Sequence, residues 1–273
     1  MRDDLGDRMK SSYEDRTRYM LPRRTYTIIR LDGKAFHTYT RGLKKPFDND
    51  LFEDIDNAII AMLPDIQGAV FAYTQSDEIS ILLTDFATPQ TSAWFDGNLQ
   101  KVGSVAASIM TAEFNQVRFE RAFKIAQGLP MDLKNAKLIK HLAYFDARVF
   151  TIPDRIEVMN YFIWRNQDCA RNSVSMVAQS LFSHKELQGK STATMHEMMH
   201  AKGVNWATDF PDGAKNGRLI VKESYQACVS IPDVKNFKVN SAAVERTRWV
   251  AKGAWKFTED KEKLLAMVPN YSA

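Results

Sequence analysis

The chain has 273 residues, of which 45% are hydrophobic and 11% aromatic, so it has ample material for a core, and a disordered or fibrous chain is excluded. Its formal net charge of +4 is compatible with an anionic partner but does not demonstrate one. The 2 cysteines form neither a disulfide framework nor a CxxC motif. No apolar run has the length of a membrane helix, so we expect a cytoplasmic protein without a membrane partner.

Helix and strand patterns alternate along most of the chain. In order, they predict a polar helix at 5–20, a strand at 25–31, a helix at 48–63, strands at 68–73 and 79–83, a helix at 98–118, a strand at 141–150 and a long helix at 154–182. Asp48 is suited to cap the helix that follows it. The remainder is more irregular, with a strand predicted at 218–223 and a polar end. This order favours an α+β fold with an antiparallel sheet flanked by helices.

Acidic residues occur where the predicted strands end. Asp32 follows the first strand, and Asp77 and Glu78 lie in the turn between the next two. If the first strand lies beside that hairpin, the three carboxylates converge at one edge of the sheet. Convergent carboxylates are typical ligands of Mg²⁺, and Gly33 would allow its carbonyl to approach the ion closely. The alternative is an ordinary turn and a solvated hairpin tip.

Several motifs in fixed order extend this interpretation. They are RLDGKAFH at 30–37, KPFD at 45–48, QSDE at 75–78, FDARV at 145–149 and WRNQDC at 164–169. Together they resemble the motifs of the tRNA-His guanylyltransferase family. The resemblance implies a polymerase-palm-like catalytic domain over 1–150. It also implies that 151–273, a long helix with a C-terminal α/β extension, packs on that domain as part of the same globular unit.

The resemblance also implies an activity and its residues. Members of the family add nucleotides in the 3′-to-5′ direction: they activate a tRNA 5′-monophosphate with ATP or GTP, and the 3′-hydroxyl of an incoming nucleoside triphosphate then attacks it. By resemblance, Asp32, the Gly33 carbonyl and Asp77 would hold two Mg²⁺ ions, and Asp32, Asp77 and Glu78 would be the catalytic residues. The residues implied to contact nucleotide or the RNA 5′ end are Lys34, Phe36, His37, Lys45, Asp48, Ser76, Lys101, Arg148 and Asn172.

Bland alternatives exist for some of these residues. Lys45 could belong to a solvated loop, Arg148 could be the partner of Asp146, and His37 could be a satisfied core histidine.

One departure from the family pattern bears on the substrate. Where the eukaryotic enzymes carry HINNLYN after the cysteine, this chain has ARNSVSM at 170–176, and only Asn172 is kept. The tract is more similar to the bacterial, archaeal and phage-type members, which resemble template-dependent repair enzymes. We therefore predict 5′-end repair of truncated tRNA, with guanosine addition at position −1 of tRNA-His as the alternative. A nucleotide cyclase and a non-catalytic RNA-binding protein are less favoured.

Other patterns carry less weight. His196, Glu197 and His200 form an HExxH motif, but no third zinc ligand is evident, and a surface helix is favoured. A basic and aromatic tract at 246–256 could contact RNA or form a solvated amphipathic segment. Relatives are typically tetramers, and small residues in the helix at 98–118 could pack against a second copy, so we predict a homotetramer.

Overall fold

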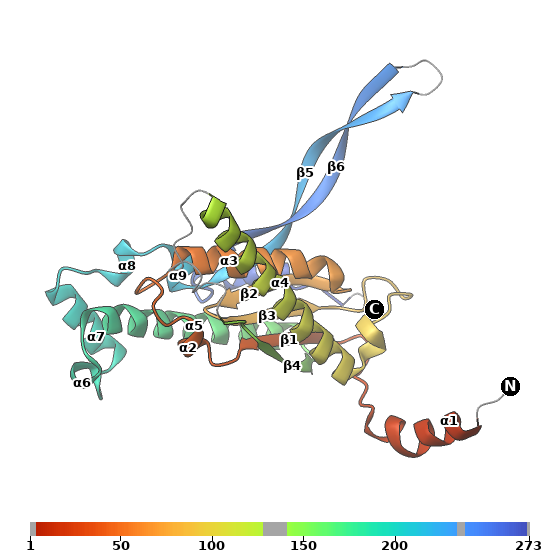
Figure 1. Cartoon of the computed structure of the whole chain (residues 1–273), viewed down its shortest axis with the longest axis horizontal. Helices are drawn as coiled ribbons and strands as arrows, with labels where there is room; N and C mark the ends of the chain where they lie inside the picture. Colours follow the sequence, from red (N-terminus) through yellow and green to blue (C-terminus); the bar gives the residue numbers. More distant parts are fainter. Residues whose placement is uncertain (1–3, 128–140, 234–237, 272–273) are drawn as a thin grey trace.

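The computed structural model describes residues 4–127, 141–233 and 238–271, and its centre is an antiparallel sheet (Figure 1). The six strands lie in the order β4-β1-β3-β2-β5-β6. They are β1 (Tyr26–Gly33), β2 (Ala69–Gln75), β3 (Glu78–Leu83), β4 (Phe145–Ile152), β5 (Arg218–Asp233) and β6 (Lys238–Gly253). Every adjacent pair is antiparallel. The predicted α+β fold with an antiparallel sheet is confirmed.

The helices predicted at 48–63, 98–118 and 154–182 are confirmed, although the second continues to Gln127, and the helix predicted at 5–20 is divided into three short helical segments that end at Thr17. The described helices are α1 (Asp4–Met9), α2 (Phe36–Tyr39), α3 (Asn49–Met62), α4 (Leu99–Gln127), α5 (Arg155–Leu181), α6 (His184–Leu187), α7 (Thr192–Ala201), α8 (Trp206–Asp209), α9 (Asp212–Lys215) and α10 (Lys261–Met267), with short 3₁₀ or π segments at Lys10–Glu14, Asp15–Thr17, Leu63–Asp65 and Trp94–Gly97. The carboxylates of Asp48 and Asp154 cap α3 and α5 by accepting backbone N–H groups.

Helices cover both faces of the sheet. On one face α3 and α4 pack against β1 and β3, and the fully buried Ile29 and Ile81 belong to this cluster. On the other face α5 and α10 pack against a cluster that contains Ile28 and Phe71. Because successive strand residues point to opposite faces, β1 is apolar on both sides rather than alternating. The predicted strand is therefore covered on both faces, and the strand order places it between β4 and β3.

The last two strands form a long hairpin that the sequence did not reveal. Only Arg218, Leu219 and Ile220 of β5 pair with β2, and the hairpin then projects from the body of the molecule (Figure 1). The predicted strand at 218–223 was too short, and the expectation of an irregular polar end was wrong. The hairpin is held by strand pairing and by contacts such as Lys222 over the ring of Trp249, so it lacks the one-sided apolar pattern that marks a half-buried strand.

The small residues of α4 face the sheet of their own chain. A Cβ at Gly103 would lie 3.6 Å from the side chain of Val149 in β4, and Ala106 is fully buried in the core. Gly103 and Ala106 therefore pack within their own chain, whereas Ser108 is exposed, and a contact of this helix with a second copy stays a prediction. Among the described residues, no helix is long and apolar enough to cross a membrane.

Candidate active site

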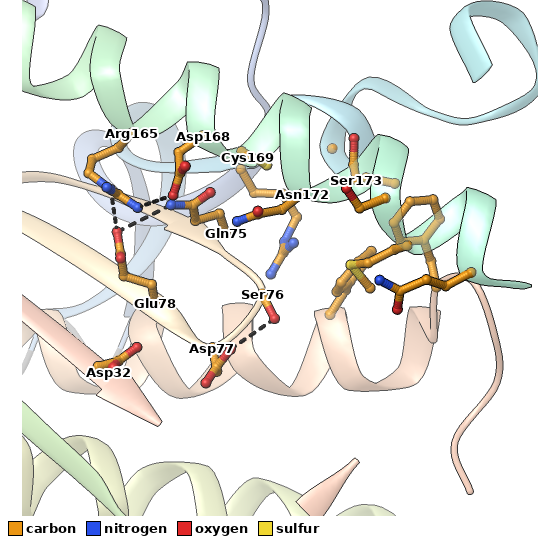
Figure 2. A pocket seen from close by; sticks show the side chains of 18 residues that line it. Asp32, Gln75, Ser76, Asp77, Glu78, Arg165, Asp168, Cys169, Asn172 and Ser173 are labelled. Atoms are coloured by element: carbon orange, nitrogen blue, oxygen red, sulfur yellow. Dashed lines mark hydrogen bonds and ion pairs between the residues drawn. The ribbon is translucent and has the colours of Figure 1, made fainter. Parts of the chain in front are cut away.

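The acidic residues predicted to converge lie at one end of the central strands. Leu31 of β1 pairs with Ile79 of β3, so β1 lies directly beside the hairpin that carries Asp77. A Cβ placed on Gly33, the neighbour of Asp32, would lie 2.9 Å from Asp77 Oδ2. Figure 2 shows Asp32 and Asp77 below the cavity that they help to line. The predicted juxtaposition of these two strand ends is confirmed.

The turn that presents Asp77 has an unusual backbone. Gln75 pairs with Glu78, which leaves Ser76 and Asp77 as a two-residue loop. Ser76 has φ of 50°, the positive sign that hairpin turns of this length require and that glycine or asparagine usually supplies. A serine in this region costs about 1–3 kcal/mol, and such strain is common at functional sites. The Ser76 hydroxyl donates a hydrogen bond of 2.9 Å to Asp77 Oδ1, which orients that carboxylate.

Glycine is required at position 33 because two groups approach it closely. A Cβ there would overlap the ring of Phe36 as well as approach Asp77. The Phe36 ring cannot retreat, since it is 5% exposed and packs against Tyr39, Phe114 and Phe145. The ring of Phe36 is thus a core group, and a nucleotide contact from this residue would have to come from its backbone.

Asp77 lies in an environment that disfavours its charge. The pKa of Asp77 is raised from 3.8 to about 6. Burial is the largest cause, the Ser76 hydroxyl acts in the opposite direction, and the charges of Asp32 and Glu78 make a smaller contribution to the rise. Within the described part of the chain, no three His, Cys, Asp or Glu side chains form a metal cluster. Two carboxylates that share one cavity are a set that suits Mg²⁺, because that ion is usually completed by phosphate oxygens and water.

Glu78 points away from the aspartates and is held by an arginine of α5 (Figure 2). Arg165 Nε donates to Glu78 Oε1 at 2.7 Å, and Arg165 Nη2 donates to Asp168 at 2.7 Å. The arginine is only 5% exposed and lies over the ring of Trp164. Sequence reasoning gave Arg165 and Asp168 no role, although their i, i+3 spacing within WRNQDC places both on one face of a helix.

The aspartates open into a cavity between the sheet end and α5. Its polar lining includes Ser76 and Asn172, two of the predicted nucleotide-binding residues. An adjoining pocket shares Phe47, Ser76 and Gln179 with this cavity and adds His37 and Lys45. His37 is exposed rather than a core histidine. The structure thus brings His37, Lys45, Ser76 and Asn172 together beside the acidic residues.

Comparison with known proteins identifies the family. The tRNAHis guanylyltransferase family matches residues 6–153. A structure of a bacterial tRNA(His) guanylyltransferase-like protein in complex with ATP is 38% identical, superimposes with a TM-score of 0.77, and the match covers 97% of this chain and 99% of that one. The chain belongs to the tRNAHis guanylyltransferase family. It is therefore a nucleotidyltransferase.

Two other members of the tRNAHis guanylyltransferase family are more distant in sequence, and a second bacterial structure has the same identity as the first. The tRNA(His) guanylyltransferase of Debaryomyces hansenii is 28% identical over 225 residues, which cover 77% of each chain. The probable tRNA(His) guanylyltransferase of Homo sapiens is 24% identical over 239 residues, or 82% of this chain and 74% of the human one. A second structure of the bacterial protein, in complex with GTP, gives a TM-score of 0.72 at 38% identity, covering 97% of this chain and 99% of that one.

Not all of the residues implied by the family motifs lie in the cavity. The Asp48 carboxylate accepts the N–H groups of Leu51 and Lys44 at 2.9 and 3.0 Å, so it is engaged in the loop that positions Lys45. Lys101 lies in the first turn of α4. Thr111 of the same helix accepts the Phe145 N–H at the start of β4, beside the acidic end of the sheet. Lys101 is about 15 Å from Thr111 along the helix, so it lies away from that end.

Arg148 and Lys34 also lie outside the cavity lining. Arg148 is exposed on β4, directly opposite Arg30 in the register that also pairs Asp32 with Asp146. Lys34 lines a separate pocket on the far side of α2.

The HExxH motif has no part in this family site. His196, Glu197 and His200 lie on α7 and line a pocket of their own, where the His196 ring contacts Trp206 edge to face at 5.4 Å. The described residues offer these side chains no third metal-binding group. The surface-helix interpretation of this motif is therefore the one the geometry favours.

Proposed function

We propose that this protein restores missing nucleotides at the 5′ end of tRNA by template-dependent addition in the 3′-to-5′ direction. The observation that carries the proposal is the pair Asp32 and Asp77, which lie close to Gly33 and open into a cavity that continues to Lys45. Support comes from the structures of a 38% identical relative in complex with ATP and with GTP. We propose ATP, GTP and other nucleoside triphosphates as substrates and the cytoplasm as the location.

The proposed reaction has two displacements at phosphorus. In the first, an oxygen of the RNA 5′-monophosphate attacks the α-phosphorus of ATP or GTP, and pyrophosphate leaves. In the second, the 3′-hydroxyl oxygen of an incoming nucleoside triphosphate loses its proton and attacks the 5′-phosphorus of the RNA, and the nucleoside monophosphate leaves. Both steps develop negative charge on phosphate oxygens, so both require positive charge near Asp32 and Asp77.

The site is suited to bind divalent cations. Asp32, the Gly33 carbonyl and Asp77 would hold two Mg²⁺ ions, which neutralise attacking and leaving oxygens in reactions of this class. Ser76 orients the Asp77 carboxylate, and Arg165 keeps the Glu78 carboxylate in place behind the pair. We propose that Glu78 therefore supports the site through its position rather than as a ligand.

Basic and polar side chains next to the acidic pair would bind the substrates. Lys45 and His37 lie in the adjoining pocket, where a lysine is suited to a triphosphate. Ser76 and Asn172 line the main cavity. Arg148 on β4 is directly opposite Arg30 on β1 in the strand register, so both side chains leave the same face of the sheet, and an arginine there is suited to bind a phosphate. We propose Lys34, Lys101 and Asp48 only as peripheral contributors.

One residue of the chain favours repair over obligatory guanosine addition to tRNA-His. Ala170 on α5 stands where the eukaryotic motif begins with histidine, so a side chain that such enzymes carry is missing here. The alternative, guanosine addition at position −1, fits the names of the relatives. The predicted homotetramer remains a prediction.

The test is a 5′-extension assay with a labelled tRNA that lacks its first nucleotide, supplied with Mg²⁺, ATP and all four nucleoside triphosphates. The wild-type protein should lengthen this RNA with the nucleotide complementary to the opposite base. Asp77→Asn should reduce the rate about 1000-fold, because cation binding contributes several kcal/mol to such transition states. Asp65→Asn, an exposed acid after α3, is the control and should retain the rate.

Changing the template base distinguishes the two substrate classes. If the added nucleotide follows the template base, repair is supported. If guanosine is added whatever the opposite base, and only to intact tRNA-His, the repair proposal is contradicted. If no RNA is lengthened, the proposed function as a whole is wrong.

A further inference from the structure

A separate pocket on the far side of α2 takes no part in the chemistry described above. Its lining includes two cationic side chains, Lys34 and Arg41, and the rings of Tyr39, His141 and Tyr144. We call it the aromatic-basic pocket. Among the residues that the structure describes, no aspartate or glutamate is part of its lining. Its composition therefore favours an anionic ligand that also has a flat ring.

The walls of the aromatic-basic pocket are fixed by the fold. The Tyr39 ring packs against Phe36 and Phe114, at 4.9 and 5.8 Å between ring centroids, so it is a rigid surface. The Lys34 N–H donates to the Tyr144 carbonyl oxygen at 2.8 Å, which ties the loop after β1 to the segment before β4. The Tyr39 ring and the backbone that carries Tyr144 are therefore in place without a ligand.

The outer wall is open to solvent. Tyr144 is 54% exposed, and its neighbour Leu142 is 61% exposed. A tyrosine ring that is held by its backbone but half exposed offers a stacking surface, and an aromatic side chain is worth about 1–3 kcal/mol for each unpaired base that stacks on it. Bases within a duplex are already stacked on one another, so such a surface selects unpaired nucleotides.

The aromatic-basic pocket is connected to the active site. It shares Arg41 and Gly42 with the pocket that contains Lys45, and that pocket shares Ser76 with the cavity of the acidic pair. Lys34 is also only two residues after Asp32. A strand that leaves the reacting end of an RNA can therefore reach this pocket through the adjoining one, past the C-terminal end of α2.

We propose that the aromatic-basic pocket binds an unpaired nucleotide of the RNA substrate, in the single strand that continues past the template base opposite the 5′ end. A base would stack on Tyr144, and the adjacent phosphates would contact Lys34 and Arg41. The inference rests on the proposed function, because it requires an RNA end at Asp32 and Asp77. It adds a binding site that positions the template strand.

The experiment compares two hairpin RNAs that share the same recessed 5′ end and template base. One continues into a short single-stranded 3′ overhang, and the other ends at the template base. We expect the full-length protein to bind the RNA with the overhang about 10-fold more tightly, the effect of stacking one base. Tyr144→Ala should remove this difference, whereas Tyr144→Phe should keep it because stacking does not need the hydroxyl. Tyr13→Ala removes a tyrosine that is 64% exposed in the N-terminal helical segment, and it should keep the difference.

The charge contribution has its own readout. The logarithm of the binding constant falls linearly with the logarithm of the salt concentration. For the RNA with the overhang, Arg41→Gln should make this fall less steep by about 0.7, the value expected for one contact to a single-stranded phosphate. The slope for the RNA without the overhang should change less.

Several outcomes would overturn the inference. If wild type binds both RNAs equally and still lengthens them, the aromatic-basic pocket has no role in RNA binding while the proposed function stands. If Tyr144→Ala keeps the preference for the overhang, another surface provides it. If a photoreactive ATP labels Tyr144 as efficiently as a 4-thiouridine in the overhang does, the pocket binds free nucleotides rather than the RNA strand. Failure to lengthen any RNA would instead contradict the proposed function.

Discussion

Two aspartates, the buried Asp54 and the half-buried Asp77, have opposite surroundings in the structure. Asp54 of α3 is 0% exposed and meets two arginines of α4, Arg118 and Arg121. Asp77 at the sheet end accepts a hydrogen bond from the Ser76 hydroxyl, and the carboxylates of Asp32 and Glu78 act on it as like charges. One carboxylate is neutralised by the chain, and the other is left with like charges.

The difference shows how the partners of a carboxylate distinguish a structural role from a functional one. At Asp54 the ion pairs join α3 to α4, and each charge is satisfied within the protein. At the sheet end an arginine is also present, but Arg165 binds Glu78 and Asp168 rather than Asp32 or Asp77. A pair of carboxylates without a cationic side chain is unfavourable unless a cation from solution binds there. The contrast can be tested by changing each site in turn.

The largest effect on the free energy of unfolding is expected at Asp54, whose charge is neutralised by arginines. Asp54→Asn leaves Arg118, which is 4% exposed, without its anionic partner. Removing one partner of a buried ion pair costs about 3–5 kcal/mol, so the free energy of unfolding in urea should fall by that amount. A fall of less than about 1 kcal/mol would show that the two aspartates are not treated differently.

A smaller effect, with a distinctive pH dependence, is expected at the acidic pair. In metal-free protein the folded-state pKa of Asp77, about 6, lies above its unfolded value of 3.8, so the folded state binds more protons between these values. The free energy of unfolding should therefore fall, by about 2–3 kcal/mol, as pH rises from about 4 to 6. Denaturation with EDTA at several pH values measures this fall.

The same titration contains its own controls. Asp77→Asn should remove this part of the pH dependence, because the amide does not titrate. Mg²⁺ should restore stability above pH 6, since it neutralises Asp32 and Asp77 once both are ionised. If the free energy of unfolding of the wild-type protein instead rises through this pH range and does not change with Mg²⁺, the proposed difference between Asp77 and Asp54 is wrong.

The smallest effect is expected for an exposed member of the α3–α4 ion pairs. Glu53 contacts the same Arg121 as Asp54 does, at 2.7 Å, but its side chain is 64% exposed. Exposed pairs contribute about 0–1 kcal/mol, so Glu53→Gln should change the free energy of unfolding by less than about 1 kcal/mol. Because the partner is shared, comparing Glu53→Gln with Asp54→Asn isolates the effect of burial.

The sequence alone determined the local elements and the position of the acidic residues along them. A β-branched run before Asp32, a second pair of strands around Asp77 and a capping Asp48 are patterns within single segments, and each is confirmed. The family motifs then identified the chain, because they record residue types in fixed order.

Tertiary structure alone decided which groups meet. Each of three features depends on residues that are far apart in the chain. They are the Arg165–Glu78 pair, the burial of Asp77 that raises its pKa, and the aromatic-basic pocket. The long β5–β6 hairpin was missed for a related reason. Periodicity reports the burial of a segment against a core, and a hairpin held mainly by its own strand pairing has no such face to report.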